Sequence, residues 1–153
     1  QIGCKIRGIY MSTKDVQFLF IDDDVDEHYL FKGDLNRYAP DADLQCFDSW
    51  VTFETYLAES NYKLHKRTVV LLDLNMPEIS GYEVIERIRS DRRLDALPII
   101  VYSTSGADAD IQKSYQLGAN SFVTKPHDRD QAEFVTRVLA EYWSNCAKLP
   151  SLS

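Results

Sequence analysis

Three short segments of the chain are apolar or aromatic at every position, and a charged or hydroxyl side chain follows each of them directly. They are Phe18–Ile21, Val69–Leu72 and Ile99–Tyr102. Such runs, rich in β-branched and aromatic residues, are too short for a helix and predict strands. A strand without polar alternation has to be covered on both faces, which is typical of a parallel sheet between two layers of helices.

Two weaker runs, Leu44–Phe47 and Ser121–Val123, complete the set of predicted strands. Apolar residues after each strand recur at three- and four-residue spacing, which predicts a helix after each strand. The first helix should end at Pro40, and the second should begin at Asp48 or Ser49. The residues that mark the helices are Leu30, Phe31, Asp34, Leu35 and Tyr38; Trp50, Phe53, Glu54 and Leu57; Gly81, Val84, Ile85 and Ile88; Ile111 and Tyr115; and Val135, Val138, Leu139 and Tyr142. The alternation predicts one α/β domain with a doubly wound, five-stranded parallel sheet, (βα)5.

The composition fits one ordinary globular domain. The chain has 153 residues, of which 44% are hydrophobic and 27% charged, so it can bury a sizeable core without disulfides. Its net charge of −7 argues against a nucleic-acid or membrane-surface partner, because both need a basic surface. The 3 cysteines are widely spaced and form no zinc or disulfide pattern, so we expect a cytoplasmic protein.

The ends of the chain are expected to lie outside the folded domain. Met11 is followed by a polar segment, so we expect the natural protein to begin there and residues 1–10 to be foreign to it. We predict an N-terminal extension over residues 1–15, a folded domain over residues 16–146 and a C-terminal tail over residues 147–153.

Reactive side chains stand where the predicted strands end. Asp22 and Asp23 follow the first strand, Asp73 the third, Ser103 the fourth and Lys125 the fifth. The carboxyl ends of parallel strands meet at one edge of a sheet, and open α/β sheets bind their ligands at that edge. We therefore expect these side chains to converge.

Three carboxylates in one crevice repel one another, and a divalent cation relieves the repulsion. Mg²⁺ prefers oxygen ligands and usually shares a phosphate, while a lysine and a serine can bind the other phosphoryl oxygens. The set therefore predicts a carboxylate nucleophile that forms an aspartyl phosphate. Each residue alone has a simpler reading, such as a helix cap for Asp22 and Asp23 or a turn for Ser103, so the inference depends on the whole pattern.

The motifs around these residues resemble the response-regulator receiver domain of two-component signalling. They are FLFIDDD (18–24), VVLLDLNMPEISGYEVIERIR (69–89), LPIIVYSTS (97–105) and FVTKP (122–126). The resemblance covers about residues 16–143 and implies a flavodoxin-like fold with strand order 2-1-3-4-5. The amino-acid sequences of the second and third motifs are similar to those of small stand-alone regulators associated with phytochrome-type kinases.

The resemblance assigns a phosphoacceptor and a Mg²⁺ site. Asp73 resembles the phosphoacceptor and is also a metal ligand. Asp23 would bind Mg²⁺ directly, Asp22 mainly through water, and Asn75 through its backbone carbonyl.

The resemblance also assigns catalytic and switching residues. Ser103 resembles the switch hydroxyl, Lys125 the phosphate-binding lysine and Phe122 the aromatic switch residue. Asn75 and Thr104 flank the approach of the water that hydrolyses the aspartyl phosphate. Thr104 departs from the family, where this residue is commonly small.

Two local expectations concern the neighbours of these residues. The resemblance implies a cis peptide between Lys125 and Pro126. The 3 histidines lack the spacing of a metal site or a catalytic triad, and we expect His28 at the surface.

The resemblance implies a signalling domain, not an enzyme, although the domain catalyses its own phosphorylation and dephosphorylation. A histidine kinase or a histidine phosphotransfer protein would supply the phosphoryl group, and small acyl phosphates could replace it. With no DNA-binding or enzymatic domain attached, the output would be docking to an unknown protein or onward phosphotransfer. A homodimer is left open.

Other classes remain as alternatives. A phosphorylation-independent interaction module on the same scaffold would not need the full set of site residues. A flavodoxin-type cofactor binder needs a phosphate loop after the first strand, where this chain has acids. A haloacid-dehalogenase-like phosphatase needs a second acid at position 75, where this chain has asparagine.

Overall fold

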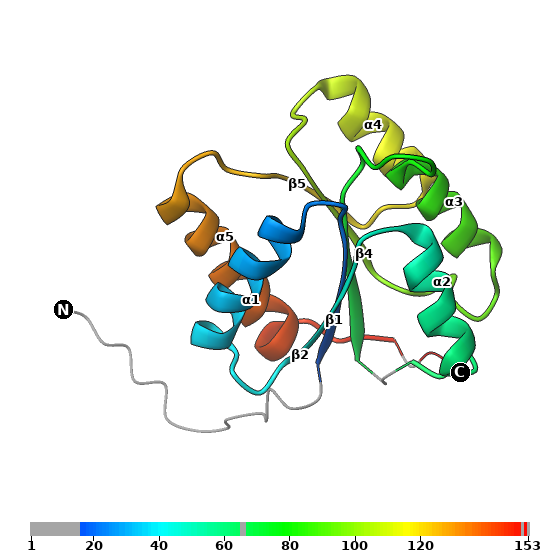
Figure 1. Cartoon of the computed structure of the whole chain (residues 1–153), viewed down its shortest axis with the longest axis horizontal. Helices are drawn as coiled ribbons and strands as arrows, with labels where there is room; N and C mark the ends of the chain where they lie inside the picture. The colour runs from blue at the N-terminus through cyan, green and yellow to red at the C-terminus, as the bar shows by residue number, and fades with distance from the viewer. Residues whose placement is uncertain (1–15, 65–66, 151, 153) are drawn as a thin grey trace.

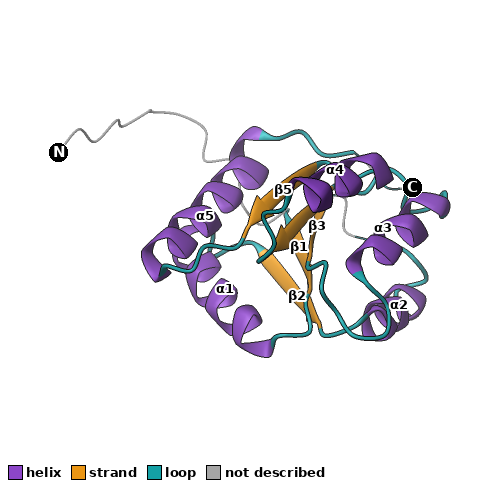
Figure 2. Cartoon of the chain, turned by 90° about the horizontal axis from the view of Figure 1, so that it is seen from above, coloured by secondary structure: helices purple, strands orange, loops and turns teal. Residues whose placement is uncertain are grey.

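The computed structural model describes residues 16–64, 67–150 and 152. Five parallel strands form one sheet in the order β2-β1-β3-β4-β5, and helices cover both of its faces (Figures 1 and 2). The elements are β1 Gln17–Ile21, α1 Val25–Tyr38, β2 Asp43–Phe47, α2 Trp50–Glu59, β3 Thr68–Leu72, α3 Gly81–Ser90, β4 Ile99–Ser103, α4 Asp108–Leu117, β5 Ser121–Thr124, α5 Arg129–Glu141 and the π-helical turn η2 Tyr142–Cys146. The predicted fold class and strand order are confirmed.

The sheet separates two hydrophobic cores. Leu19 and Ile21 of β1 point into the core that α2 and α3 cover, while Phe18 and Phe20 point into the core that α1 and α5 cover. All five residues of β1, β3 and β4 are buried. This two-sided burial explains why the three central strands carry no polar alternation.

Local signals in the sequence fix the helix ends. Helix α1 ends at Tyr38, and its C-cap Ala39 directly precedes Pro40. Ser49 caps α2 in a reciprocal capping box with Thr52, so the predicted start at Asp48 or Ser49 falls on the serine. Gly118 ends α4 with φ of 112°, a left-handed conformation that favours glycine.

The predicted apolar stripes of the last two helices are buried only in part. Tyr115, Val138 and Tyr142 are 49%, 46% and 50% exposed. Ser114 and Thr136 are buried instead, and each hydroxyl donates to the carbonyl four residues earlier in its own helix. Because that hydrogen bond satisfies the hydroxyl, a polar residue can be buried, and apolar periodicity does not detect it.

The predicted domain boundaries at residues 16 and 146 stay a prediction, and the extension over residues 1–15 lies outside the described residues. Within the part of the chain that the structure describes, no helix has the length and apolar character needed to cross a membrane.

Candidate functional site

Backbone hydrogen bonds of the sheet place the predicted residues side by side. The N–H of Asp73 donates to the carbonyl of Ile21 in β1 at 2.9 Å, which holds Asp73 beside Asp22. The N–H of Lys125 donates to the carbonyl of Ser103 at 2.7 Å. Residues distant in sequence therefore converge at the carboxyl edge of the sheet, as expected.

Lys125 joins two of the carboxylates inside this edge. Its Nζ lies 2.5 Å from Oδ2 of Asp22 and 3.8 Å from Oδ1 of Asp73, and all three side chains are buried. Burial alone would lower the pKa of Lys125, but the hydrogen bond to Asp22 and the charges of both carboxylates raise it above the ordinary value. The ammonium therefore stays charged and faces the oxygens of Asp73.

The negative charge around Asp73 exceeds the positive charge that Lys125 supplies. One carboxylate oxygen from each of Asp22, Asp23 and Asp73 lies within 4.8 Å of the others. Burial, followed by the charge of Asp22, raises the pKa of Asp73 to about 6, although Lys125 opposes the shift. Added positive charge would stabilise these three carboxylates, and the exposed Asp23 opens the cluster to solvent. The cluster is therefore suited to bind a cation.

The donor set fits a hard divalent cation. All three side chains offer carboxylate oxygen, the ligand that Mg²⁺ and Mn²⁺ prefer. The N–H of Asn75 donates to the carboxylate of Asp73, and the Asn75 side chain is exposed at the mouth of the site. The acidic cluster is thus compatible with Mg²⁺.

Gly81 fixes the loop that follows Asp73. Its N–H donates to the carbonyl of Leu74 at 2.9 Å. A Cβ at this position would lie 2.3 Å from the carbonyl oxygen of Asp73 and 2.7 Å from Cα of Leu74. The N-terminus of α3 therefore packs directly on the backbone of Asp73, which only a glycine allows.

The predicted switching residues lie at the ends of β4 and in β5. Ser103 is fully buried, and its Oγ accepts a hydrogen bond from the N–H of Ser105 at 3.4 Å. Thr104 is exposed, and its assigned part in hydrolysis stays a prediction. Phe122 is partly buried against the core on the α2 and α3 side, and its N–H donates to the hydroxyl of Tyr115 at 3.2 Å.

Two local expectations are wrong. His28 is buried, not at the surface, and its ring packs edge-on against Phe20 with centroids 5.1 Å apart. It shares the inner face of α1 with Phe31 and Leu35 at helical spacing, a signal that the sequence contained. Burial lowers the pKa of His28 despite the charge of Asp22. The peptide between Lys125 and Pro126 is trans, the ordinary state of such a bond.

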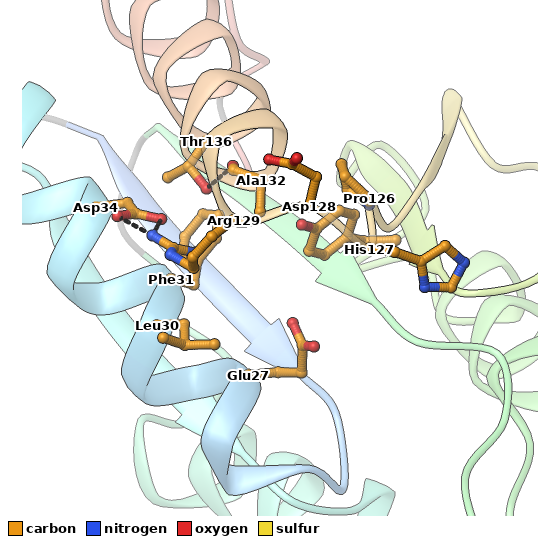
Figure 3. Close-up of a pocket in the computed structure, with 11 residues that line it drawn as sticks. Glu27, Leu30, Phe31, Asp34, Pro126, His127, Asp128, Arg129, Ala132 and Thr136 are labelled. Carbon is orange, nitrogen blue, oxygen red and sulfur yellow. Dashed lines mark hydrogen bonds and ion pairs between the residues drawn. The ribbon is translucent and has the colours of Figure 1, made fainter.

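A cavity of about 170 Å³ lies beside the site, between α1 and α5 (Figure 3). Its lining includes Glu27, Tyr102 and Arg129, but not Asp73. Within it, Arg129 donates to both carboxylate oxygens of the buried Asp34 at 2.5 Å. The sequence pattern did not indicate this contact, which ties the start of α5 to α1.

Comparison with known proteins identifies the family. A family model described as the response regulator receiver domain matches residues 19–137. The chain therefore belongs to the response regulator receiver domain family of two-component signalling.

Two similar proteins illustrate the range of the family. The chain is 34% identical over 82 residues to the "Probable methanogenesis regulatory protein FilR2" of Methanothrix harundinacea, which is 54% of this chain and 53% of that protein. The chain thus spans about half the length of this relative. It is 28% identical over 111 residues to the chemotaxis protein CheY1 of Helicobacter pylori, covering 72% of this chain and 86% of CheY1.

A solved structure extends the comparison. The phosphorylated cyanobacterial phytochrome response regulator RcpA superimposes with a TM-score of 0.80 and 28% identity, over 88% of this chain and 98% of that chain. The superposition thus covers almost the whole of the RcpA chain. The predicted similarity to phytochrome-associated regulators is confirmed at the level of the fold.

Proposed function

We propose that this chain is a response regulator that accepts a phosphoryl group on Asp73 from a phosphohistidine of a histidine kinase or a histidine phosphotransfer protein. The observation that carries the proposal is the placement of Asp73, a buried carboxylate between the ammonium of Lys125 and two further acids. Burial of several charges in one place costs free energy, so an acid with only a structural role would not need these charged neighbours.

Each residue of the site has its own role in the phosphoryl transfer. A carboxylate oxygen of Asp73 attacks phosphorus, the bond from phosphorus to the imidazole nitrogen of the donor breaks, and the imidazole leaves with the electron pair. Lys125 binds a phosphoryl oxygen, and Ser103 donates a hydrogen bond to another. Asp22, Asp23, Asp73 and the carbonyl of Asn75 would hold Mg²⁺, which when bound neutralises phosphoryl charge.

The lifetime of the aspartyl phosphate depends on access of water to phosphorus. The side chains of Asn75 and Thr104 are both exposed at the carboxyl edge of the sheet. Threonine adds a branched, stiff side chain where a small residue would leave room. We therefore assign Asn75 and Thr104 to the control of hydrolysis, with Thr104 slowing it.

The donor would dock over the start of α1. Val25 and Tyr29 are 70% and 79% exposed, and both belong to helix α1, which begins directly after Asp24. Exposed apolar side chains beside a reactive group are typical of an interaction surface.

The output would use the surface formed by α4, β5 and α5. Movement of Ser103 toward the phosphoryl oxygens and of Phe122 inward would change the surface of α4, β5 and α5. Helix α5 exposes Phe134 and Val138, and the turn η2 that follows it exposes Tyr142, so an apolar stripe at four-residue spacing is available to an output protein or a second copy of the chain. The chain would thus act in the cytoplasm as a signalling domain that catalyses only its own phosphorylation and dephosphorylation.

Incubation with acetyl phosphate and Mg²⁺, followed by intact mass measurement, tests the proposal. The wild type should gain one phosphoryl group, and Asp73→Asn should gain none while staying folded. Asp41→Asn, which changes an exposed acid outside the site, is the matched control and should behave like the wild type. Equal labelling of Asp73→Asn would contradict the assignment, and no labelling by any donor would favour a phosphorylation-independent module.

A further inference from the structure

A hydrogen-bonded chain connects the predicted switch hydroxyl to helix α4. The N–H of Ser105 donates to Oγ of Ser103 at 3.4 Å, and Oγ of Ser105 donates to Oδ2 of Asp110 in the first turn of α4. Ser105 therefore contacts the switch residue through its backbone and α4 through its side chain. This connection lies outside the acidic site.

The carboxylate of Asp110 has a second, independent partner. The hydroxyl of Tyr82 in α3 donates to Oδ1 of Asp110, and Nζ of Lys113 lies 4.1 Å from the centre of the Tyr82 ring. Figures 1 and 2 both place α3 beside α4. Tyr82 follows Gly81, whose backbone packs against Asp73, so this partner is anchored to the site.

The charge states suit these contacts. Hydrogen bonds from Ser105 and Tyr82 lower the pKa of Asp110, so the side chain is an ionised acceptor for both. Burial and the contact with Asp110 raise the pKa of Tyr82 to about 12, so its hydroxyl remains a donor. Tyr82 thereby helps to hold the carboxylate where it accepts the hydrogen bond from Ser105 in the loop between β4 and α4.

We propose that Asp110 is a positioning residue, which acts through Ser105 to couple the switch hydroxyl of Ser103 to helix α4. This inference rests on the proposed phosphorylation of Asp73. Ser103 cannot move toward the phosphoryl group without carrying the Ser105 backbone or breaking its hydrogen bond. Because the side chain of Ser105 is held by Asp110, the movement reaches the first turn of α4.

The coupling can be measured with beryllium fluoride and Mg²⁺, a phosphoryl mimic, by the amide chemical shifts of the labelled protein. In the wild type, addition of the mimic should shift the amides of residues 73–75 and those of residues 108–117. In Ser105→Ala and in Asp110→Ala, the first group should shift in full, while the response of α4 should be largely lost, because the hydrogen bond that links it to the loop is absent.

Two variants separate the connection from general damage to the helix. Ser105→Thr retains the hydroxyl and should restore the response of α4. Asp108→Ala removes an exposed acid from the same first turn and should respond like the wild type. A full response of α4 in both Ser105→Ala and Asp110→Ala, or an equal loss in Asp108→Ala, would overturn the coupling alone. Failure of residues 73–75 to respond in the wild type would count against the proposed function itself, and the coupling with it.

Discussion

Replacement of Asp73 by asparagine should stabilise the metal-free protein. Burial and the neighbouring carboxylates raise the pKa of Asp73 from 3.8 to about 6, so the native state disfavours the ionised side chain. A difference of about two pKa units corresponds to roughly 3 kcal/mol. Asparagine has a similar shape and no charge, but Lys125 loses a partner at 3.8 Å. We therefore expect the free energy of unfolding to rise by about 1–3 kcal/mol at pH 8.

The pH dependence of this gain has a definite sign. The native state binds the Asp73 proton more tightly than the unfolded state, so protonation stabilises the wild type. This contribution is fully present below pH 3.8 and is lost as the pH rises through about 6. The advantage of Asp73→Asn should therefore be largest above pH 6 and should shrink toward pH 4. Mg²⁺ should also reduce it, because the cation stabilises the wild-type carboxylates.

Urea unfolding in EDTA at pH 8 and pH 5, repeated with Mg²⁺ at pH 8, measures these differences. Asp41→Asn controls for the loss of one negative charge from a chain with a net charge of −7. An unchanged or lowered stability of Asp73→Asn at pH 8, or a gain that does not depend on pH, would show that the native state does not disfavour the ionised side chain of Asp73.

Three further predictions concern other residues of the site. Lys125→Met should lower the free energy of unfolding by about 3 kcal/mol in EDTA at pH 8, because it leaves two buried carboxylates without their cation, and urea titration checks this. Thr104→Ala should speed the decay of the phosphorylated protein in Mg²⁺, and an unchanged or slower decay would contradict a blocking role. Gly81→Ala should lower the midpoint of thermal unfolding, since its Cβ meets backbone at 2.3 Å; a midpoint equal to that of the wild type would contradict the close contact.

The sequence predicted the central strands well because they are buried on both faces, which leaves an unbroken apolar run. The weakest predicted strand, β2, forms the edge of the sheet, and most of its residues are exposed or half-exposed. An edge strand needs apolar residues on fewer positions, which explains its weak signal. The residues at the strand ends were predictable for the same reason as the strands, because parallel topology brings those ends together.

Contacts that depend on side-chain packing between elements were not predictable. The chain from Ser105 through Asp110 to Tyr82 depends on how α3 and α4 lie against the β4–α4 loop, which no periodicity encodes. The burial of His28, by contrast, follows the helical spacing that it shares with Phe31 and Leu35, so the sequence did contain a signal for it.

The central claim is that Asp73 forms a covalent bond with a phosphoryl group. The most direct measurement is reduction of the phosphorylated protein with borohydride, which converts an aspartyl phosphate to homoserine, followed by mass spectrometry of its peptides. Homoserine is expected at position 73 only after treatment with phosphodonor and Mg²⁺. An unmodified Asp73 in a protein that carries the phosphoryl group on another residue would contradict it.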